Sequence, residues 1–144
     1  MAKRRSKKYD LPAGFTPLKK LGEGAGNVVM AVKDETTGNE LALKLATEQD
    51  QAHRLQQEFA ILARLDRPGI LHVYETGFHK KRPYFTMELI EGKPFNRFMD
   101  EHRSEPGFIE LFLRVLGKAA TTLSDIHQEG IVHADVKPAN LLVR

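Results

Sequence analysis

The sequence contains no cysteine, and this absence excludes two kinds of protein at once. Without thiols the chain can form neither a disulfide framework nor a thiolate metal site. The sequence also lacks an apolar run long enough to cross a bilayer, and its first residues include no apolar signal region. We therefore expect a cytoplasmic chain without a membrane segment.

No sign of charge dominates the chain. Its 22 Lys and Arg residues are nearly balanced by 19 Asp and Glu residues, which gives a formal net charge of +3. This modest charge gives no reason to expect a specific nucleic-acid partner. Basic residues do crowd the start of the chain, and we expect residues 1–14 to form a flexible leader whose charges are solvated. The other residues are enough for the core of about one domain.

The most informative stretch of the chain runs from His133 to Asn140 and reads H-A-D-V-K-P-A-N. Here Asp135, Lys137 and Asn140 place a carboxylate, an ammonium and a carboxamide close together on what we expect to be a loop. Such a set can take a proton from a hydroxyl, neutralise a phosphate and hold a metal ion, as phosphoryl transfer requires. A polar turn after a helix is the simpler interpretation, since Pro138 and Asn140 suit one.

A glycine-rich segment lies upstream, from Leu21 to Val29, and reads L-G-E-G-A-G-N-V-V. Its glycines favour a tight strand-turn-strand hairpin whose backbone can approach phosphate oxygens with no Cβ atom in the way. A glycine-rich hairpin without a ligand would explain the same segment equally well.

Lys44 and Glu58 form a further candidate pair. Residues 41–44 alternate in a way that predicts a strand, and the apolar spacing from Gln51 to Leu65 predicts a helix. Burial of a lysine is costly unless a carboxylate pairs with it, and Glu58 within this helix is a candidate partner for Lys44. A solvated lysine and an ordinary exposed glutamate are the simpler alternatives.

Together these motifs resemble those of protein kinases, and of bacterial Ser/Thr kinases in particular. The stretch at His133 is similar to the catalytic-loop pattern H-R-D-L-x-x-x-N, from which it departs at Ala134. The glycine-rich segment is similar to G-x-G-x-x-G-x-V, with Asn27 at the third glycine, and residues 41–44 fit the V-A-I-K strand. Lys137, two residues after the aspartate, resembles the Ser/Thr type.

The resemblance covers residues 15–144 and implies an α+β, protein-kinase-like fold. It implies a small lobe at 15–88, with a five-stranded antiparallel sheet and one helix. A hinge at 88–93 would follow, and then the start of a helical large lobe at 94–144. The family's D-F-G motif does not occur in the sequence. We therefore expect a partial kinase domain, truncated before that motif and inactive on its own.

Two helices are expected within the large lobe, at 95–102 and at 109–128. The longer helix carries an apolar stripe that indicates a core-facing surface. We expect that the elements of this chain cannot cover all members of the stripe, among them Leu113, Leu116, Leu123 and Ile126.

The resemblance also implies transfer of the γ-phosphoryl group of ATP to a Ser or Thr hydroxyl of a protein substrate, with Mg²⁺ as cofactor. Asp135 would accept the hydroxyl proton, Lys137 would neutralise the γ-phosphate, and Asn140 would hold one magnesium ion. Lys44 and Glu58 would anchor the α- and β-phosphates. The other nucleotide-binding residues that the resemblance implies are Leu21, Gly22, Glu23, Gly24, Ala25, Gly26, Asn27, Val28, Val29, Ala42, Met87, Glu88, Ile90 and Leu142.

Two other functions remain open at this point. The chain could be a non-catalytic module that binds a nucleotide or a partner and transfers nothing. It could also resemble small-molecule kinases of the aminoglycoside type, which share H-x-D-x-x-x-x-N but seldom the Lys-Pro pair at Lys137.

Overall fold

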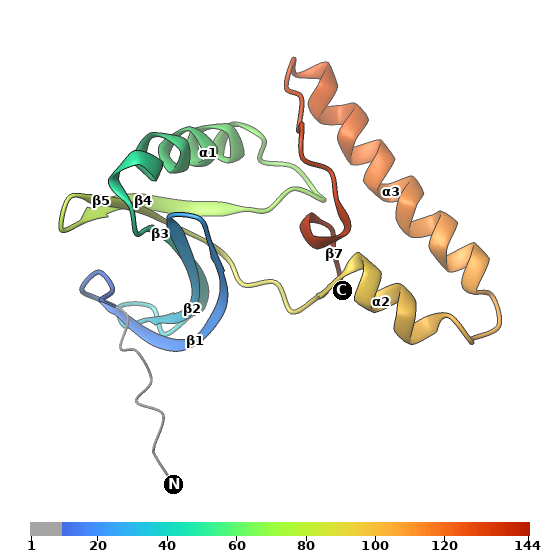
Figure 1. Cartoon of the computed structure of the whole chain (residues 1–144), viewed down its shortest axis with the longest axis horizontal. Coiled ribbons are helices and arrows are strands. Elements are labelled where there is room, and N and C mark those ends of the chain that lie inside the picture. The colour runs from blue at the N-terminus through green and yellow to red at the C-terminus, as the bar shows by residue number, and fades with distance from the viewer. Residues whose placement is uncertain (1–9) are drawn as a thin grey trace, which may run out of the picture. The chain divides into compact units, whose positions relative to one another are not determined.

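The computed structural model describes residues 10–144, which divide into two compact units (Figure 1). The first unit contains the described residues up to Arg64, together with Leu71–Leu89. The second contains Leu65–Ile70 and Ile90–Arg144. The segment Leu65–Ile70 therefore belongs with the second unit, although the sequence places it in the small lobe.

The first unit is built on a five-stranded sheet in which every neighbouring pair is antiparallel. The strand order is β1-β2-β3-β5-β4, so β1 and β4 form the two edges. This architecture confirms the expected five-stranded antiparallel sheet. The strands are β1 (Phe15–Gly24), β2 (Asn27–Asp34), β3 (Glu40–Ala46), β4 (Val73–His79) and β5 (Arg82–Glu88).

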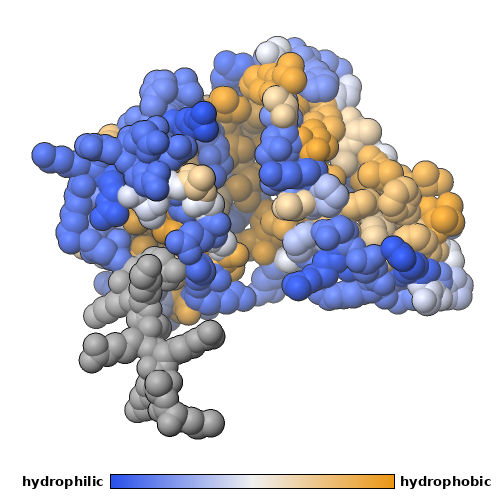
Figure 2. Space-filling view, viewed as in Figure 1, coloured by the Kyte–Doolittle hydropathy of each residue, from blue (hydrophilic) through white to orange (hydrophobic). Residues whose placement is uncertain are grey.

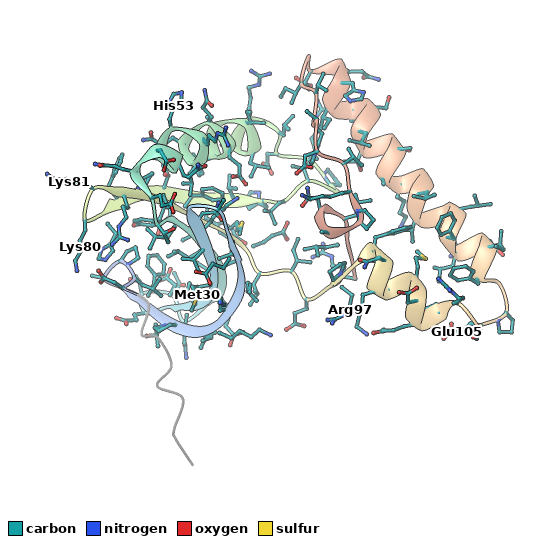
Figure 3. All side chains as sticks on the ribbon, viewed as in Figure 1. Met30, His53, Lys80, Lys81, Arg97 and Glu105 are labelled. Atoms are coloured by element: carbon teal, nitrogen blue, oxygen red, sulfur yellow. The ribbon has the colours of Figure 1, made fainter. Side chains whose placement is uncertain are left out.

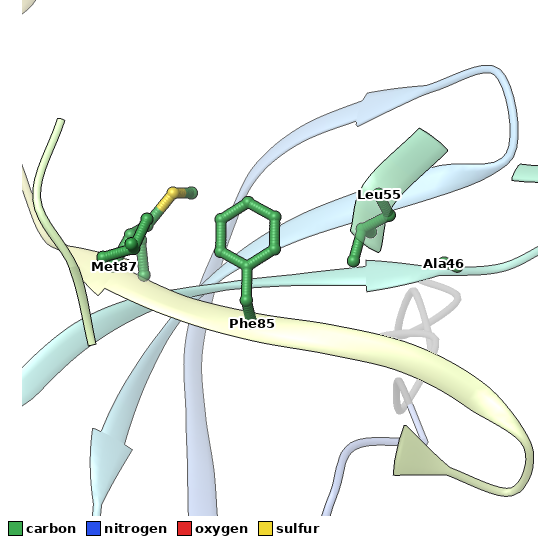
Figure 4. Packing of buried hydrophobic residues seen from close by; sticks show 6 residues of the cluster. Ala46, Leu55, Phe85 and Met87 are labelled. Atoms are coloured by element: carbon green, nitrogen blue, oxygen red, sulfur yellow. The ribbon is translucent and has the colours of Figure 1, made fainter. Parts of the chain in front are cut away.

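Alternating side chains give this sheet two apolar faces. One face carries a buried cluster to which helix α1 contributes (Figure 4). The other face carries a second buried cluster, drawn only from β2 and β3. The first cluster consists of Ala42, Ala46, Leu55, Val73, Phe85 and Met87, and the second of Val28, Met30, Val32, Leu43 and Leu45.

Helix α1 (Ala52–Arg64) follows a short 3-10 turn, η1 (Gln49–Gln51). The helix buries Leu55 in the first cluster, and its Phe59 ring lies 5.7 Å from that of Phe85. This packing sets the face that α1 turns toward the sheet, and with it the direction of the neighbouring Glu58.

Residues 10–14, which the sequence places in the flexible leader, are attached to the sheet. Leu11 packs against the second apolar cluster, and the Asp10 carboxylate lies 2.6 Å from Lys80 Nζ and 3.0 Å from His79 Nε2. The expected leader is therefore wrong for this stretch, because ion pairs and apolar contact hold it in place. The rest of that leader, residues 1–9, lies outside the described part of the chain.

The second unit contains two longer helices and a small strand pair. The strand pair is antiparallel and joins residues 93–94 to residues 142–143. The expected helix at 95–102 is confirmed, and the longer helix begins one residue earlier than expected. The elements are β6 (Lys93–Pro94), α2 (Phe95–His102), α3 (Phe108–Gln128), η2 (Pro138–Asn140) and β7 (Leu142–Val143).

The segment Leu65–Ile70 packs on α3. Arg67 forms an ion pair with Glu129, and Gly69 lies so close to the helix that a Cβ atom there would be 2.7 Å from the hydroxyl of Thr122. Gly69 also has a φ of +85°, which side chains rarely adopt. These contacts explain why the segment belongs to the second unit.

Only part of the apolar stripe of helix α3 is buried by neighbouring residues. Ile126 is buried with 3% of its surface exposed, but Leu113 is 61% and Leu116 37% exposed. Figure 2 shows this apolar surface over α3, where Ile109 adds to it. The expectation that the stripe cannot be covered completely is therefore confirmed by Leu113 and Leu116, while Ile126 is buried. None of the described helices is long and apolar enough to cross a membrane.

Candidate active site

The glycine-rich hairpin closes in a tight turn between β1 and β2. Gly24 and Asn27 are its last cross-strand pair, which leaves Ala25 and Gly26 as the turn residues. Gly26 has a φ of +78°, so glycine suits the turn at this position. A Cβ atom at Gly22 would meet no other atom within 4 Å, so packing within the chain gives no reason for glycine there. The open space instead fits close approach of a ligand to the backbone.

Lys44 and Glu58 meet as expected. The Lys44 Nζ atom donates to both carboxylate oxygens of Glu58, at 2.9 and 2.8 Å. The Lys44 side chain is 19% exposed and that of Glu58 42%, so the pair is partly shielded from water. Glu58 thereby fixes the direction of the Lys44 side chain on the sheet face that packs against α1.

Three of the other predicted nucleotide-binding residues, Val29, Ala42 and Met87, lie beside this pair on the sheet. Val29 is the cross-strand partner of Lys44, and Ala42 is the partner of Met87. The side chain of Val28 belongs to the cluster on the opposite face, so only its backbone is available on the Lys44 side. The end of β5 is fixed because the amide of His72 donates to the Glu88 carboxylate at 2.9 Å.

The second unit holds the loop that carries the other predicted residues. The Asp135 carboxylate lies 3.2 Å from Lys137 Nζ. The backbone N–H of Asp135 donates to His133 Nδ1 at 3.2 Å. Asn140 Nδ2 donates to the Asp135 backbone oxygen at 2.8 Å and to the Asp135 carboxylate at 3.2 Å. The loop therefore holds the carboxylate between an ammonium and a carboxamide. Ala134 adopts a φ of +61° to make the bend.

This arrangement determines the charge of Asp135. The hydrogen bond from Lys137 is the main reason that the pKa of Asp135 lies below its usual value of 3.8, and the bond from Asn140 adds to it. The carboxylate is therefore ionised at neutral pH and available as a hydrogen-bond acceptor.

Asn140 and Asp135 carry side-chain oxygens of the kind that bind a magnesium ion. Both hydrogen bonds of Asn140 to Asp135 use its amide nitrogen, so its amide oxygen takes part in neither. Mg²⁺ prefers oxygen ligands, and it is commonly held by one or two protein groups together with substrate phosphates. Among residues 10–144 no group of three His, Asp or Glu side chains is placed to hold a metal by itself. The donor set therefore suits a metal that a phosphate ligand shares.

Ile90 and Leu142 lie on the segments joined by the small strand pair. Pro94 is the cross-strand partner of Leu142, and the Phe95 amide donates to the Leu141 carbonyl at 2.8 Å. A Cβ atom at Gly92 would lie 2.9 Å from the carbonyl oxygen of Val143, so only glycine permits this close approach. The structure thus ties residues just after β5 to the end of the chain.

The predicted residues fall into two groups, one in each unit. The first group lies around Lys44 and Glu58, and the second around Asp135. Sequence reasoning missed one residue at the first group, Gln51, whose side chain lies against Gly26. No signal pointed to it, because its place at the start of a helical pattern gives no hint of a contact with a hairpin.

In comparison with known proteins, this chain is similar to protein kinases. Residues 15–144 match the protein kinase domain. The DNA damage-responsive serine/threonine-protein kinase RqkA of Deinococcus radiodurans is 35% identical over 138 residues, which are 92% of this chain and 20% of that protein. Serine/threonine-protein kinase PknJ of Mycobacterium tuberculosis is 30% identical over 136 residues, which are 91% of this chain and 23% of that protein.

A solved structure gives the same result for the fold. The crystal structure of the Mycobacterium tuberculosis PknI kinase domain matches with a TM-score of 0.69 and 28% sequence identity. The match covers 90% of this chain and 55% of that one. The chain thus spans about half of the matched kinase domain, and about a fifth of the length of RqkA and PknJ.

Proposed function

Because the chain belongs to the protein kinase family, we propose that, as part of a complete kinase domain, it serves the transfer of the γ-phosphoryl group of ATP to Ser or Thr hydroxyls of proteins. The observation that carries the proposal is the Asp135 carboxylate, held between Lys137 and Asn140. The Ser/Thr kinases among the relatives support a protein hydroxyl as the acceptor.

Asp135 would act on the attacking hydroxyl. It would accept a hydrogen bond from the hydroxyl and take its proton as the new bond to phosphorus forms and the bond to ADP breaks. A carboxylate of lowered pKa is a weak base, so its main contribution would be to orient the hydroxyl. Lys137 would stabilise the negative charge of the transferred group.

The residues of the first unit would bind the nucleotide. Lys44, held in direction by Glu58, would pair with the α- and β-phosphates, and the backbone at Gly22 and Gly24 would approach them closely. Val29 and Ala42 would contact the adenine ring. Magnesium, when bound, would neutralise part of the phosphate charge, and the amide oxygen of Asn140 is the ligand this loop would offer.

The experiment uses the longest form of the protein that contains residues 15–144, incubated with Mg²⁺, γ-labelled ATP and a generic protein substrate. We expect labelled phosphoserine or phosphothreonine after partial acid hydrolysis. ATP binding without transfer to any acceptor would instead favour a non-catalytic module. Label on an aminoglycoside and none on protein would favour a small-molecule kinase.

A further inference from the structure

The tip of the glycine-rich hairpin is fastened to the segment that leads into α1. The carbonyl oxygen of Gly26 accepts the amide N–H of Thr47 at 2.8 Å and that of Glu48 at 3.4 Å. The Gln51 side chain lies against the same glycine: a Cβ atom at Gly26 would be 2.2 Å from Cγ of Gln51. Gly26 is buried as a result, whereas its turn neighbour Ala25 is exposed.

On the β1 side, few contacts besides the pairing with β2 hold the hairpin in place. β1 is an edge strand, and its pairing with β2 is irregular between Lys20 and Gly22. Nothing lies within 4 Å of the position where Gly22 would carry a Cβ atom, and the nearest atoms to that position at Gly24 belong to the Asn27 side chain. Glycine weakens a strand because it adds backbone freedom and supplies no side chain to pack. The contacts at Gly26 therefore restrain the tip in addition to the pairing of β1 with β2.

We propose that Gln51 is a positioning residue that holds the tip of the glycine-rich hairpin where its backbone can meet the phosphates of ATP. The inference rests on the proposed function, because it assigns that hairpin to the nucleotide phosphates. Gln51 ends η1 and is followed directly by α1, the helix that carries Glu58. The continuous segment of η1 and α1 therefore contacts both phosphate-binding elements of the first unit, the hairpin tip through Gln51 and Lys44 through Glu58.

Two variants separate this role from ordinary packing. Gln51→Ala removes the side chain that lies on Gly26, and Gln56→Ala is the matched control, an exposed glutamine on α1. We expect amide hydrogen exchange across residues 24–28 to speed up roughly fivefold in Gln51→Ala and to stay unchanged in Gln56→Ala. Exchange at the tip that is the same in all three proteins would overturn the attachment.

Ligand binding then tests what the attachment does. Gln51→Ala should raise the Kd for ATP by roughly fivefold and leave the Kd for adenosine unchanged, because adenosine has no phosphates. Equal changes in both affinities, or in neither, would overturn the positioning role. Failure of the unmodified protein to bind ATP would remove the proposed function instead, and the exchange data alone would then decide whether Gln51 holds the tip.

A double-mutant cycle with Gly26→Ala adds an independent check. A methyl group at Gly26 must displace Gln51, so its effect on exchange at residues 24–28 should be smaller when Gln51 is already alanine. Part of the effect will remain, because a φ of +78° disfavours alanine in either background. Fully additive effects would contradict a direct contact between the two residues.

Discussion

The Lys44 ammonium lies within 2.9 Å of both carboxylate oxygens of Glu58, and this contact joins β3 to α1. Neither partner is fully buried, so the pair retains part of its hydration. Its contribution to stability should therefore be modest, and its larger effect is to fix the direction of the lysine.

Glu58→Gln should lower the free energy of unfolding by about 0.5–1 kcal/mol, because water screens a pair with one half-exposed partner. Urea denaturation of the variant and of the unmodified chain measures the difference. Glu40→Gln is the matched control, since Glu40 is an exposed carboxylate on β3. A loss larger than about 3 kcal/mol would mean that the pair behaves as fully buried.

The contact of Asp10 with the turn between β4 and β5 should depend on pH. Lys80 and Lys81 make that turn with positive φ angles, and Figure 3 labels both. Hydrogen bonds from Lys80 and then His79 hold the pKa of Asp10 below its usual value of 3.8, and the Arg82 guanidinium lies 4.0 Å away. A lowered carboxyl pKa stabilises the folded state above the unfolded value, and this contribution is lost as the pH falls through the folded value.

We therefore expect the segment before β1 to be protected from proteolysis at neutral pH and to lose protection below about pH 4. Asp10→Asn should already be unprotected at neutral pH, and Asp50→Asn, at an exposed carboxylate, should behave like the unmodified chain. Equal protection in all three proteins at pH 7 would show that apolar contacts of Leu11 suffice to hold the segment.

Ala134 should tolerate glycine better than any larger residue. Its φ of +61° places Cβ near the following carbonyl oxygen, a strain of about 1–2 kcal/mol that glycine avoids. Part of that gain is lost to the greater freedom of glycine in the unfolded chain. We expect Ala134→Gly to raise the free energy of unfolding by about 0.5 kcal/mol and Ala134→Val to lower it by more than 1 kcal/mol. Stability unchanged in both would mean that the loop relaxes freely.

The uncovered face of α3 should promote self-association of the 144-residue chain. Ile109, Leu113 and Leu116 leave apolar surface exposed on one stretch of the helix. Leu113→Lys should reduce association, as measured by light scattering, and should change the unfolding free energy by less than about 0.5 kcal/mol, as expected at an exposed site. Arg114→Gln, beside it on the polar side, is the control. A chain that is monomeric before any substitution would contradict this prediction.

Local sequence patterns were enough to predict several elements of this chain. They were not enough to predict contacts between residues that lie far apart in the sequence. The apolar spacing predicted the helices α1 and α3, and the pairing of Lys44 with Glu58 followed from the resemblance of the surrounding motifs to those of protein kinases. The contacts of Asp10 and Gln51 could not be predicted in this way, because each joins residues that are far apart in the sequence and share no periodicity. The same holds for Gly69, whose need for glycine arises from its positive φ and from the nearby hydroxyl of Thr122.

The central claim, that Asp135 acts in phosphoryl transfer, is tested most directly by the initial rate of label transfer from γ-labelled ATP to a Ser/Thr protein substrate. The assay compares the longest form of the protein with its Asp135→Asn and Asp100→Asn variants, since Asp100 is an exposed carboxylate on α2. Loss of one group that acts on the reacting atoms should lower the rate about 10²–10³-fold in Asp135→Asn. Asp100→Asn should keep the full rate. Equal rates in the two variants, with both folded, would contradict the account.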